Sequence, residues 1–150
     1  MREALQAFAK RFTPPAPLAG GSFSLPSATG SADAFLAATL ADASSGRVIL
    51  AVTPGLPDAD RLADDLRLVT TDTPVRILEF PPPLEGDRSA LGLRLRSIAA
   101  LRAWELSPYP CVVVAAFPAL AAPVRAGTVP TRLSPQTGNG VTIGFSALTE

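Results

Sequence analysis

Residues 25–40, LPSATGSADAFLAATL, have the layout of a phosphate-binding loop that runs into a helix. A Gly-Ser turn follows small residues, and an apolar helical segment comes after the turn. In a working loop, glycines let backbone N–H groups surround the phosphates, a lysine neutralises the terminal phosphate groups, and a Ser or Thr hydroxyl holds Mg²⁺. This stretch is therefore the first place in the chain to look for nucleotide chemistry.

The defining positions of such a loop hold other residue types here. Placing the pattern G-x-x-x-x-G-K-[ST] on residues 27–34 puts an aspartate at the lysine position and small residues at the rest: Ser27, Ala32, Asp33 and Ala34. Two unit charges about 4 Å apart near a protein surface interact by roughly 4 kcal/mol, so replacing the cation by an anion costs on the order of 8 kcal/mol. That cost abolishes an ordinary micromolar site. We expect no ATP binding at the loop remnant, which comprises Ser27, Thr29, Gly30, Ser31, Ala32, Asp33 and Ala34.

Other common chemistries lack their residues. The chain has no histidine, which excludes His-based zinc sites and a Ser-His-Asp triad within it. Its single cysteine, Cys111, opens an apolar run, where a small buried core residue is expected rather than a reactive thiol. One cysteine forms no intramolecular disulfide, which fits a reducing cytosol. We therefore expect a cytoplasmic protein with no catalytic residue, cofactor or metal.

The charge balance argues against nucleic acid and membranes as direct partners. Thirteen basic residues balance thirteen acidic ones, so no global field attracts phosphates or anionic lipid. The only dense basic group has acidic neighbours and consists of Arg88, Arg94, Arg96 and Arg102. DNA binding is expected to be weak and nonspecific at most. No apolar run approaches the ~20 residues that a membrane-spanning helix needs.

Strand-like and helical segments alternate along the chain. Apolar, β-branched runs predict strands at residues 47–53, 74–80 and 111–116, and a short alternating segment predicts one at residues 22–25. Residues 141–148, VTIGFSAL, look like a further strand without a partner. Helical spacing predicts helices at residues 1–12, 31–43, 54–69, 89–106 and 118–122. Because residues 47–53 are almost all apolar, we expect them to form a central strand covered on both faces. Such alternation with short links predicts a three-layer α/β domain with a mostly parallel sheet.

Two of these helices have distinctive apolar patterns. In the helix after Ser31, which is expected to cap it, the predicted core-facing stripe is Phe35, Leu36, Leu40 and Ala43. The helix at 89–106 has two opposite stripes, Leu91, Leu95 and Ile98 on one side and Leu93, Ala100 and Trp104 on the other. A helix that is apolar on two sides is usually covered on two sides. Either this domain covers both, or a segment outside the chain does, in which case Leu93 and Trp104 form an exposed apolar patch.

Three stretches in order resemble a known family: GSADAFLAATLA, VILAVTPGLPDADRLADDL and FPPPLEGDRSALGLRLRSIAAL. They are similar to the N-terminal region of bacterial transcription-repair coupling factors (Mfd), a region that in turn resembles the first domain of the excinuclease subunit UvrB. The likeness spans roughly residues 18–124 and includes the Gly-Ser-Ala-x-Ala-Phe turn, whose copy in the coupling factors is a degenerate phosphate loop. The aromatic and acidic cluster often seen after the Phe-Pro segment is only partly present, as PPPLEGD.

The resemblance implies a fold and a division of the chain. The fold is a three-layer RecA-like (P-loop NTPase-like) α/β domain with a mostly parallel sheet and a degenerate phosphate loop, incomplete at its C-terminus. Residues 1–17 are then an N-terminal helix and Pro-rich connector, and residues 18–124 are the UvrB-like domain. Residues 125–150 are a linker and the start of a truncated following module.

The resemblance also implies a function. The chain would be a non-motor module that acts in transcription-coupled nucleotide excision repair, helps to restrain the motor, and supports recruitment of the excinuclease subunit UvrA through an adjoining module. RNA polymerase and DNA would be contacted only by domains absent here, and the chain would not be an enzyme. Two alternatives stay open: an unrelated α/β binding or scaffold domain, and a nucleotide-using enzyme with an atypical loop. Titration with nucleotide tests the enzyme alternative.

Overall fold

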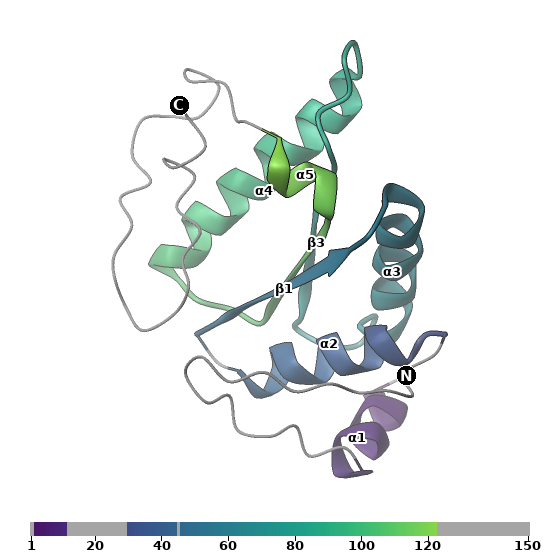
Figure 1. Ribbon diagram of the computed structural model, residues 1–150. Helices are drawn as coiled ribbons and strands as arrows, with labels where there is room; N and C mark the ends of the chain where they lie inside the picture. Colours follow the sequence, from purple (N-terminus) through teal and green to yellow (C-terminus); the bar gives the residue numbers. More distant parts are fainter. Residues whose placement is uncertain (1, 12–29, 45, 123–150) are drawn as a thin grey trace.

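The computed structural model describes residues 2–11, 30–44 and 46–122 (Figure 1). The predicted strand at 22–25, the strand-like segment at 141–148, and Ser27 and Thr29 lie outside these residues. The described elements, in chain order, are α1 (Arg2–Arg11), α2 (Ala32–Ala43), β1 (Val48–Thr53), α3 (Leu56–Val69), β2 (Arg76–Phe80), α4 (Arg88–Leu106), β3 (Cys111–Ala116) and α5 (Phe117–Ala121). No helix in this part of the chain is long and apolar enough to cross a membrane.

The three described strands form a parallel sheet in the order β1-β3-β2. Val48 of β1 and Arg76 of β2 both align with Cys111, so the strands start at the same level. The predicted α/β class with parallel strands is confirmed. The expected central position of residues 47–53 is wrong, because β3 occupies the middle and β1 lies at an edge of the described sheet. An apolar run indicates burial but carries no information on strand order, which the crossover connections decide.

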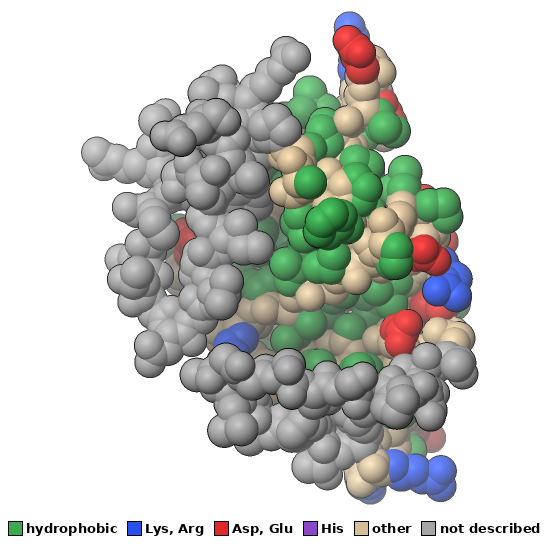
Figure 2. Space-filling model, viewed as in Figure 1, with side chains coloured by type: hydrophobic (Ala, Val, Ile, Leu, Met, Phe, Trp, Pro, Cys, Tyr) green, Lys and Arg blue, Asp and Glu red, His purple; other side chains and the backbone are tan. Residues whose placement is uncertain are grey.

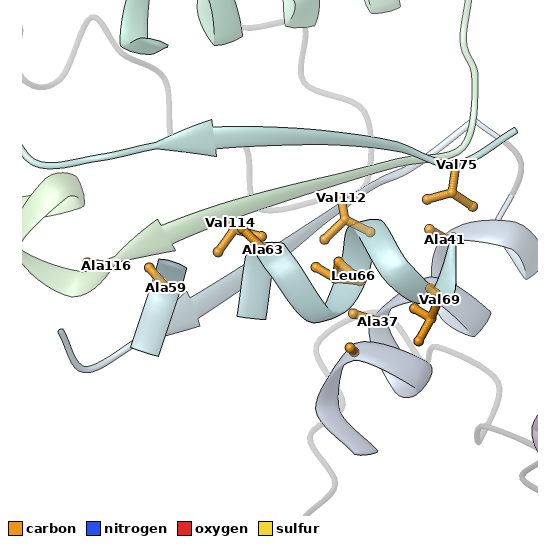
Figure 3. Packing of buried hydrophobic residues seen from close by; sticks show 12 residues of the cluster. Ala37, Ala41, Ala59, Ala63, Leu66, Val69, Val75, Val112, Val114 and Ala116 are labelled. Carbon is orange, nitrogen blue, oxygen red and sulfur yellow. The ribbon is translucent and has the colours of Figure 1, made fainter. Parts of the chain in front are cut away.

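Short side chains dominate the face of the sheet that α2 and α3 cover (Figure 3). Leu66 of α3 is fully buried there, facing Val112 and Val114 of β3. The buried residues of α2 are Ala34, Ala37, Ala38, Thr39 and Ala41. The predicted stripe on this helix is therefore wrong: Phe35, Leu36 and Leu40 are half-buried and Ala43 is exposed. α2 is apolar around most of its circumference, so spacing could not choose a face, and alanines allow the closest approach of helix and sheet.

On the opposite face, α4 packs over β2 and β3. Asp87 caps this helix by accepting hydrogen bonds from the backbone N–H groups of Ser89 (2.8 Å) and Ala90 (3.1 Å). The prediction that Leu91, Leu95 and Ile98 form one buried stripe is wrong, since only Ile98 is buried. Leu91 and Leu95 are exposed. Trp104 follows the first of the two alternatives, because it packs against the core of this domain.

Helix α1 contacts the rest of the described chain through α2. The rings of Phe8 and Phe35 lie 5.6 Å apart between centroids, in a tilted arrangement. The predicted N-terminal amphipathic helix is thus present, and Phe8 of its predicted apolar face contacts α2. Phe12 lies outside the described residues.

Candidate functional site

A groove of about 470 Å³ lies at the carboxyl end of β1, between the N-terminal halves of α2 and α3. In open α/β folds, ligands commonly bind outside the carboxyl ends of the parallel strands. The volume falls within the usual range for small-molecule sites. The described lining residues are Asp33, Leu36, Ala37, Leu40, Ile49, Ala51, Val52, Thr53, Pro54, Asp58, Arg61 and Leu62.

Each of the two helices that begin at this groove places an acidic residue in its first turn. Asp33 belongs to the first turn of α2 and Asp58 to the first turn of α3. A carboxylate there interacts favourably with the partial positive charge of the helix N-terminus. The same position would hold a phosphate in an anion site. Two carboxylates therefore stand where a nucleotide phosphate would need positive charge.

Arg61 is the cation among the described lining residues, and it already has a partner. Its Nη2 atom lies 3.7 Å from Oδ1 of Asp58, three residues earlier on α3. Both side chains are more than half exposed, so the pair contributes little to stability. From the sequence we interpreted Arg61 as part of the solvated face of this helix, and Asp58 was not singled out. A signal for these two residues was present in the sequence: an acidic and a basic residue lie in the first two turns of a helix that directly follows a predicted strand.

The described part of the loop remnant is a turn at Gly30 and Ser31 that leads into α2. Gly30 has a φ of 64°, in the left-handed region that favours glycine. Ser31 is at the N-cap position of α2 as predicted, but its side chain makes no capping hydrogen bond. Its carbonyl oxygen accepts from the N–H groups of Ala34 (3.1 Å) and Phe35 (3.3 Å). Ala34 is fully buried, so the position expected to bear a Mg²⁺-binding hydroxyl lies inside the helix–sheet interface.

The polar side chain on β1 at this groove is also engaged. Thr53 donates a hydrogen bond from Oγ1 to the carbonyl oxygen of Gly55 at 2.9 Å. Gly55 is the N-cap of α3, and Pro57 lies in the first turn of that helix, as its fixed φ predicts. This hydrogen bond therefore stabilises the turn between β1 and α3.

Arg94 has a role that the sequence did not reveal. We grouped it with Arg88, Arg96 and Arg102 as a basic patch, but only 4% of its surface is exposed. It donates from Nη1 to the carbonyl oxygens of Pro81 (2.8 Å) and Ala119 (3.3 Å), and its guanidinium lies 4.1 Å from the centroid of the Phe80 ring. Burial lowers the pKa of Arg94. This side chain ties the ends of β2 and β3 together and cannot serve DNA phosphates.

Cys111 is a core residue, as predicted. It is fully buried at the start of β3, and desolvation raises the pKa of its thiol to about 11, although the charge of nearby Arg76 acts in the opposite direction. A thiol in this state is a poor nucleophile and a poor metal ligand. Among the described residues, no group of three or more Cys, Asp or Glu side chains could hold a metal ion.

Comparisons with known proteins do not assign this chain to a family. No protein-family model, no curated protein and no solved structure matches the chain. The interpretation of the groove therefore rests on its own residues.

Proposed function

We propose that this chain is a non-catalytic α/β module with a RecA-like layout, the N-terminal UvrB-like domain of a transcription-repair coupling factor. In this proposal it acts in the cytoplasm as a scaffold in transcription-coupled nucleotide excision repair. It supports recruitment of the excinuclease subunit UvrA through the adjoining module and helps to restrain the motor. RNA polymerase and DNA are contacted by other domains.

The observation that carries the proposal is the carboxylate of Asp33 in the first turn of α2, at the mouth of the groove. A motor domain needs a cation at this place, because its catalytic power comes from electrostatic stabilisation of the phosphates. Asp58 adds a second negative charge, and Ala34 offers no hydroxyl. The resemblance to the coupling factors implies a degenerate phosphate loop, in which the helix N-terminus is kept but the lysine and the hydroxyl are missing. The order of parallel strands and helices is compatible with the same family.

Nucleotide titration tests the loss of phosphate chemistry. We expect isothermal calorimetry with Mg-ATP to show no micromolar binding to the wild-type chain. The triple substitution Ala32→Gly, Asp33→Lys and Ala34→Thr restores the lysine and hydroxyl positions, and we expect at most weak binding and no hydrolysis from it. Asp58→Asn is the matched control, since it removes a charge without adding a cation. Micromolar Mg-ATP binding by the wild type would contradict the non-catalytic assignment.

A cellular assay tests the repair role separately. After ultraviolet irradiation, cells that lack the gene for this chain should remove lesions from the transcribed strand no faster than from the non-transcribed strand. Re-expression of the wild-type gene should restore the difference. An unchanged strand preference in the deleted cells would overturn the repair role while leaving the nucleotide result intact.

A further inference from the structure

β1 is an edge strand of the sheet that the described residues form. It pairs with β3 on one side, and no other strand within the described residues pairs with it. In such a strand, every second residue directs its N–H and C=O groups away from the sheet, where they are free to bond another strand. Natural edge strands are usually protected by lysines, prolines, bulges or short length. The six residues of β1, VILAVT, contain no charged residue and no proline.

One face of this edge strand also exposes large apolar side chains. Leu50 is 44% exposed and Val52 is 48% exposed. Both share the face on which α4 packs, but α4 lies over β2 and β3 and does not reach them. Figure 2 shows hydrophobic side chains gathered over β1 and α5 in this region. An unprotected edge with an apolar face is a surface for strand addition.

We propose that β1 pairs with β1 of a second copy of this chain, antiparallel, around a two-fold axis perpendicular to the sheet. A two-fold axis perpendicular to the sheet leaves the α4 face of both copies on the same side. Each residue must therefore lie opposite a residue whose side chain is on the same face of the sheet. With the axis at Leu50, the two Leu50 side chains face each other and Val48 of one copy faces Val52 of the other. This register covers Leu50 with its own counterpart and Val52 with Val48 of the second copy.

The same register also brings opposite charges together across the proposed interface. Continuing the alternation of the strand by one residue places Arg47 on the α2/α3 side, opposite Thr53 of the second copy. Thr53 lines the groove that holds Asp33 and Asp58. Arg47 is exposed and makes no ion pair with any described residue. Each copy thus contributes a cation to the other copy's acidic groove. This inference does not depend on the proposed function.

Sedimentation equilibrium over a wide concentration range is the first test. We expect a monomer–dimer equilibrium in the wild type and a loss of association of more than about tenfold in Leu50→Lys, because a lysine blocks edge pairing. The matched control is Leu68→Lys, which alters another exposed leucine, 63% exposed on α3, and should associate as the wild type does. Equal effects of the two substitutions would overturn the proposal.

Cross-linking tests the register. Residues on the two-fold axis have Cα atoms roughly 4.5–5.5 Å apart, within the range for a disulfide. In a Cys111→Ala background, Leu50→Cys should form a disulfide-linked dimer under mild oxidation, and Leu68→Cys should not. A protein with Leu50→Cys that folds, as judged by circular dichroism, but gives no more cross-linked dimer than the control would overturn the register.

A charge exchange tests the contribution of Arg47. Arg47→Glu should weaken association about tenfold, because two exposed ion pairs are lost in each dimer. Adding Asp33→Arg should restore association in the doubly substituted protein. The competing occupant is the strand-like segment at residues 141–148 of the same chain. A strict monomer at all concentrations, with slow hydrogen exchange along β1, would show that a segment of the same chain pairs with β1 and would overturn the dimer.

Discussion

The two faces of the sheet are built differently. On one, α2 and α3 bring a continuous set of small and medium side chains against all three described strands. On the other, α4 and the short α5 cover β2 and β3, and Val48 of β1 packs beside them, while Leu50 and Val52 on the same side of β1 are exposed. The strands have similar apolar composition on both faces, so the difference arises from the number of helices and where they lie. Coverage of a sheet is a property of the helical layers and not of the strands.

Residues of β1 show the contrast within one strand. Ile49 and Ala51 are half-buried against α2, whereas their neighbours Leu50 and Val52 are exposed. Neighbouring residues of a strand point to opposite faces, so one segment contributes to the core and to an interaction surface at once. We therefore expect the α2/α3 face to supply most of the stability, and the exposed side chains of β1 on the other face to form the proposed surface for association.

The largest expected effect comes from shortening the core side chain of the α2/α3 face. Leu66→Ala should lower the free energy of unfolding by about 2–5 kcal/mol, because it leaves a cavity in a fully buried position. Leu50→Ala on the other face should cost less than about 1 kcal/mol in the monomer, since much of that side chain is already in water. Urea unfolding of both variants measures the difference. Equal losses would show that the two faces contribute alike.

The second effect concerns the polar anchor of the α4 face. Arg94→Met should cost about 2–3 kcal/mol, because the carbonyl oxygens of Pro81 and Ala119 lose a charged donor. Arg88→Met is the matched control on the same helix, at an exposed position, and should be nearly neutral. Thermal unfolding of the two variants measures whether Arg94→Met is less stable than Arg88→Met. A stable Arg94→Met protein would mean that apolar packing alone holds α4 to the sheet.

The smallest effect is an alkaline loss of stability from Cys111. Burial raises the pKa of its thiol from 9.0 to about 11 in the folded protein. Between these pH values the unfolded chain releases a proton that the folded chain keeps, so stability is complete below pH 9 and falls as pH rises towards 11. We expect a loss of about 1 kcal/mol by pH 10.

The control for this pH dependence is Cys111→Ala, because titrations common to both proteins cancel in the comparison. Urea unfolding between pH 8 and pH 10 should show a steeper decline for the wild type. Parallel pH profiles would mean that the thiol is not desolvated as deeply as its place in β3 indicates.

The elements themselves were predictable because their signals are local. β1, β2 and β3 each lie within a predicted strand at 47–53, 74–80 and 111–116. α4 begins within one residue of its predicted start, where Asp87 provides a capping side chain. Such signals depend on runs, caps and turn residues that act within a few positions of one another.

The failures concern contacts between elements. Leu91 and Leu95 have helical spacing suited to burial, yet they are exposed because α4 meets the sheet through another side, with Ile98. Arg94 lies among charged neighbours in the sequence, but the carbonyl groups that it binds belong to residues 13 and 25 positions away. Periodicity describes one element at a time and cannot report such long-range partners.

Half of the candidate site was likewise accessible to motif comparison. Asp33 and Ala34 were identified by their places in a phosphate-loop pattern. Asp58 and Arg61 were not, because only the packing of α2 and α3 beside β1 brings the start of α3 next to the start of α2, at the carboxyl end of the strand. Their contribution to the charge of the groove is a consequence of topology.

Composition and local pattern were enough to predict the parallel α/β class, which the structure confirms, and to predict a phosphate-loop pattern without its cation, because both follow from residue types at short spacing. Within the described residues, the tertiary structure decided that β3 and not β1 is the middle strand, that the small side of α2 faces the core, and that Leu50 and Val52 of β1 remain exposed. The physical reason is that apolar residues all gain free energy on leaving water, so hydrophobicity favours burial without choosing a partner. That choice depends on crossover connections and side-chain volumes, which act only once the elements meet.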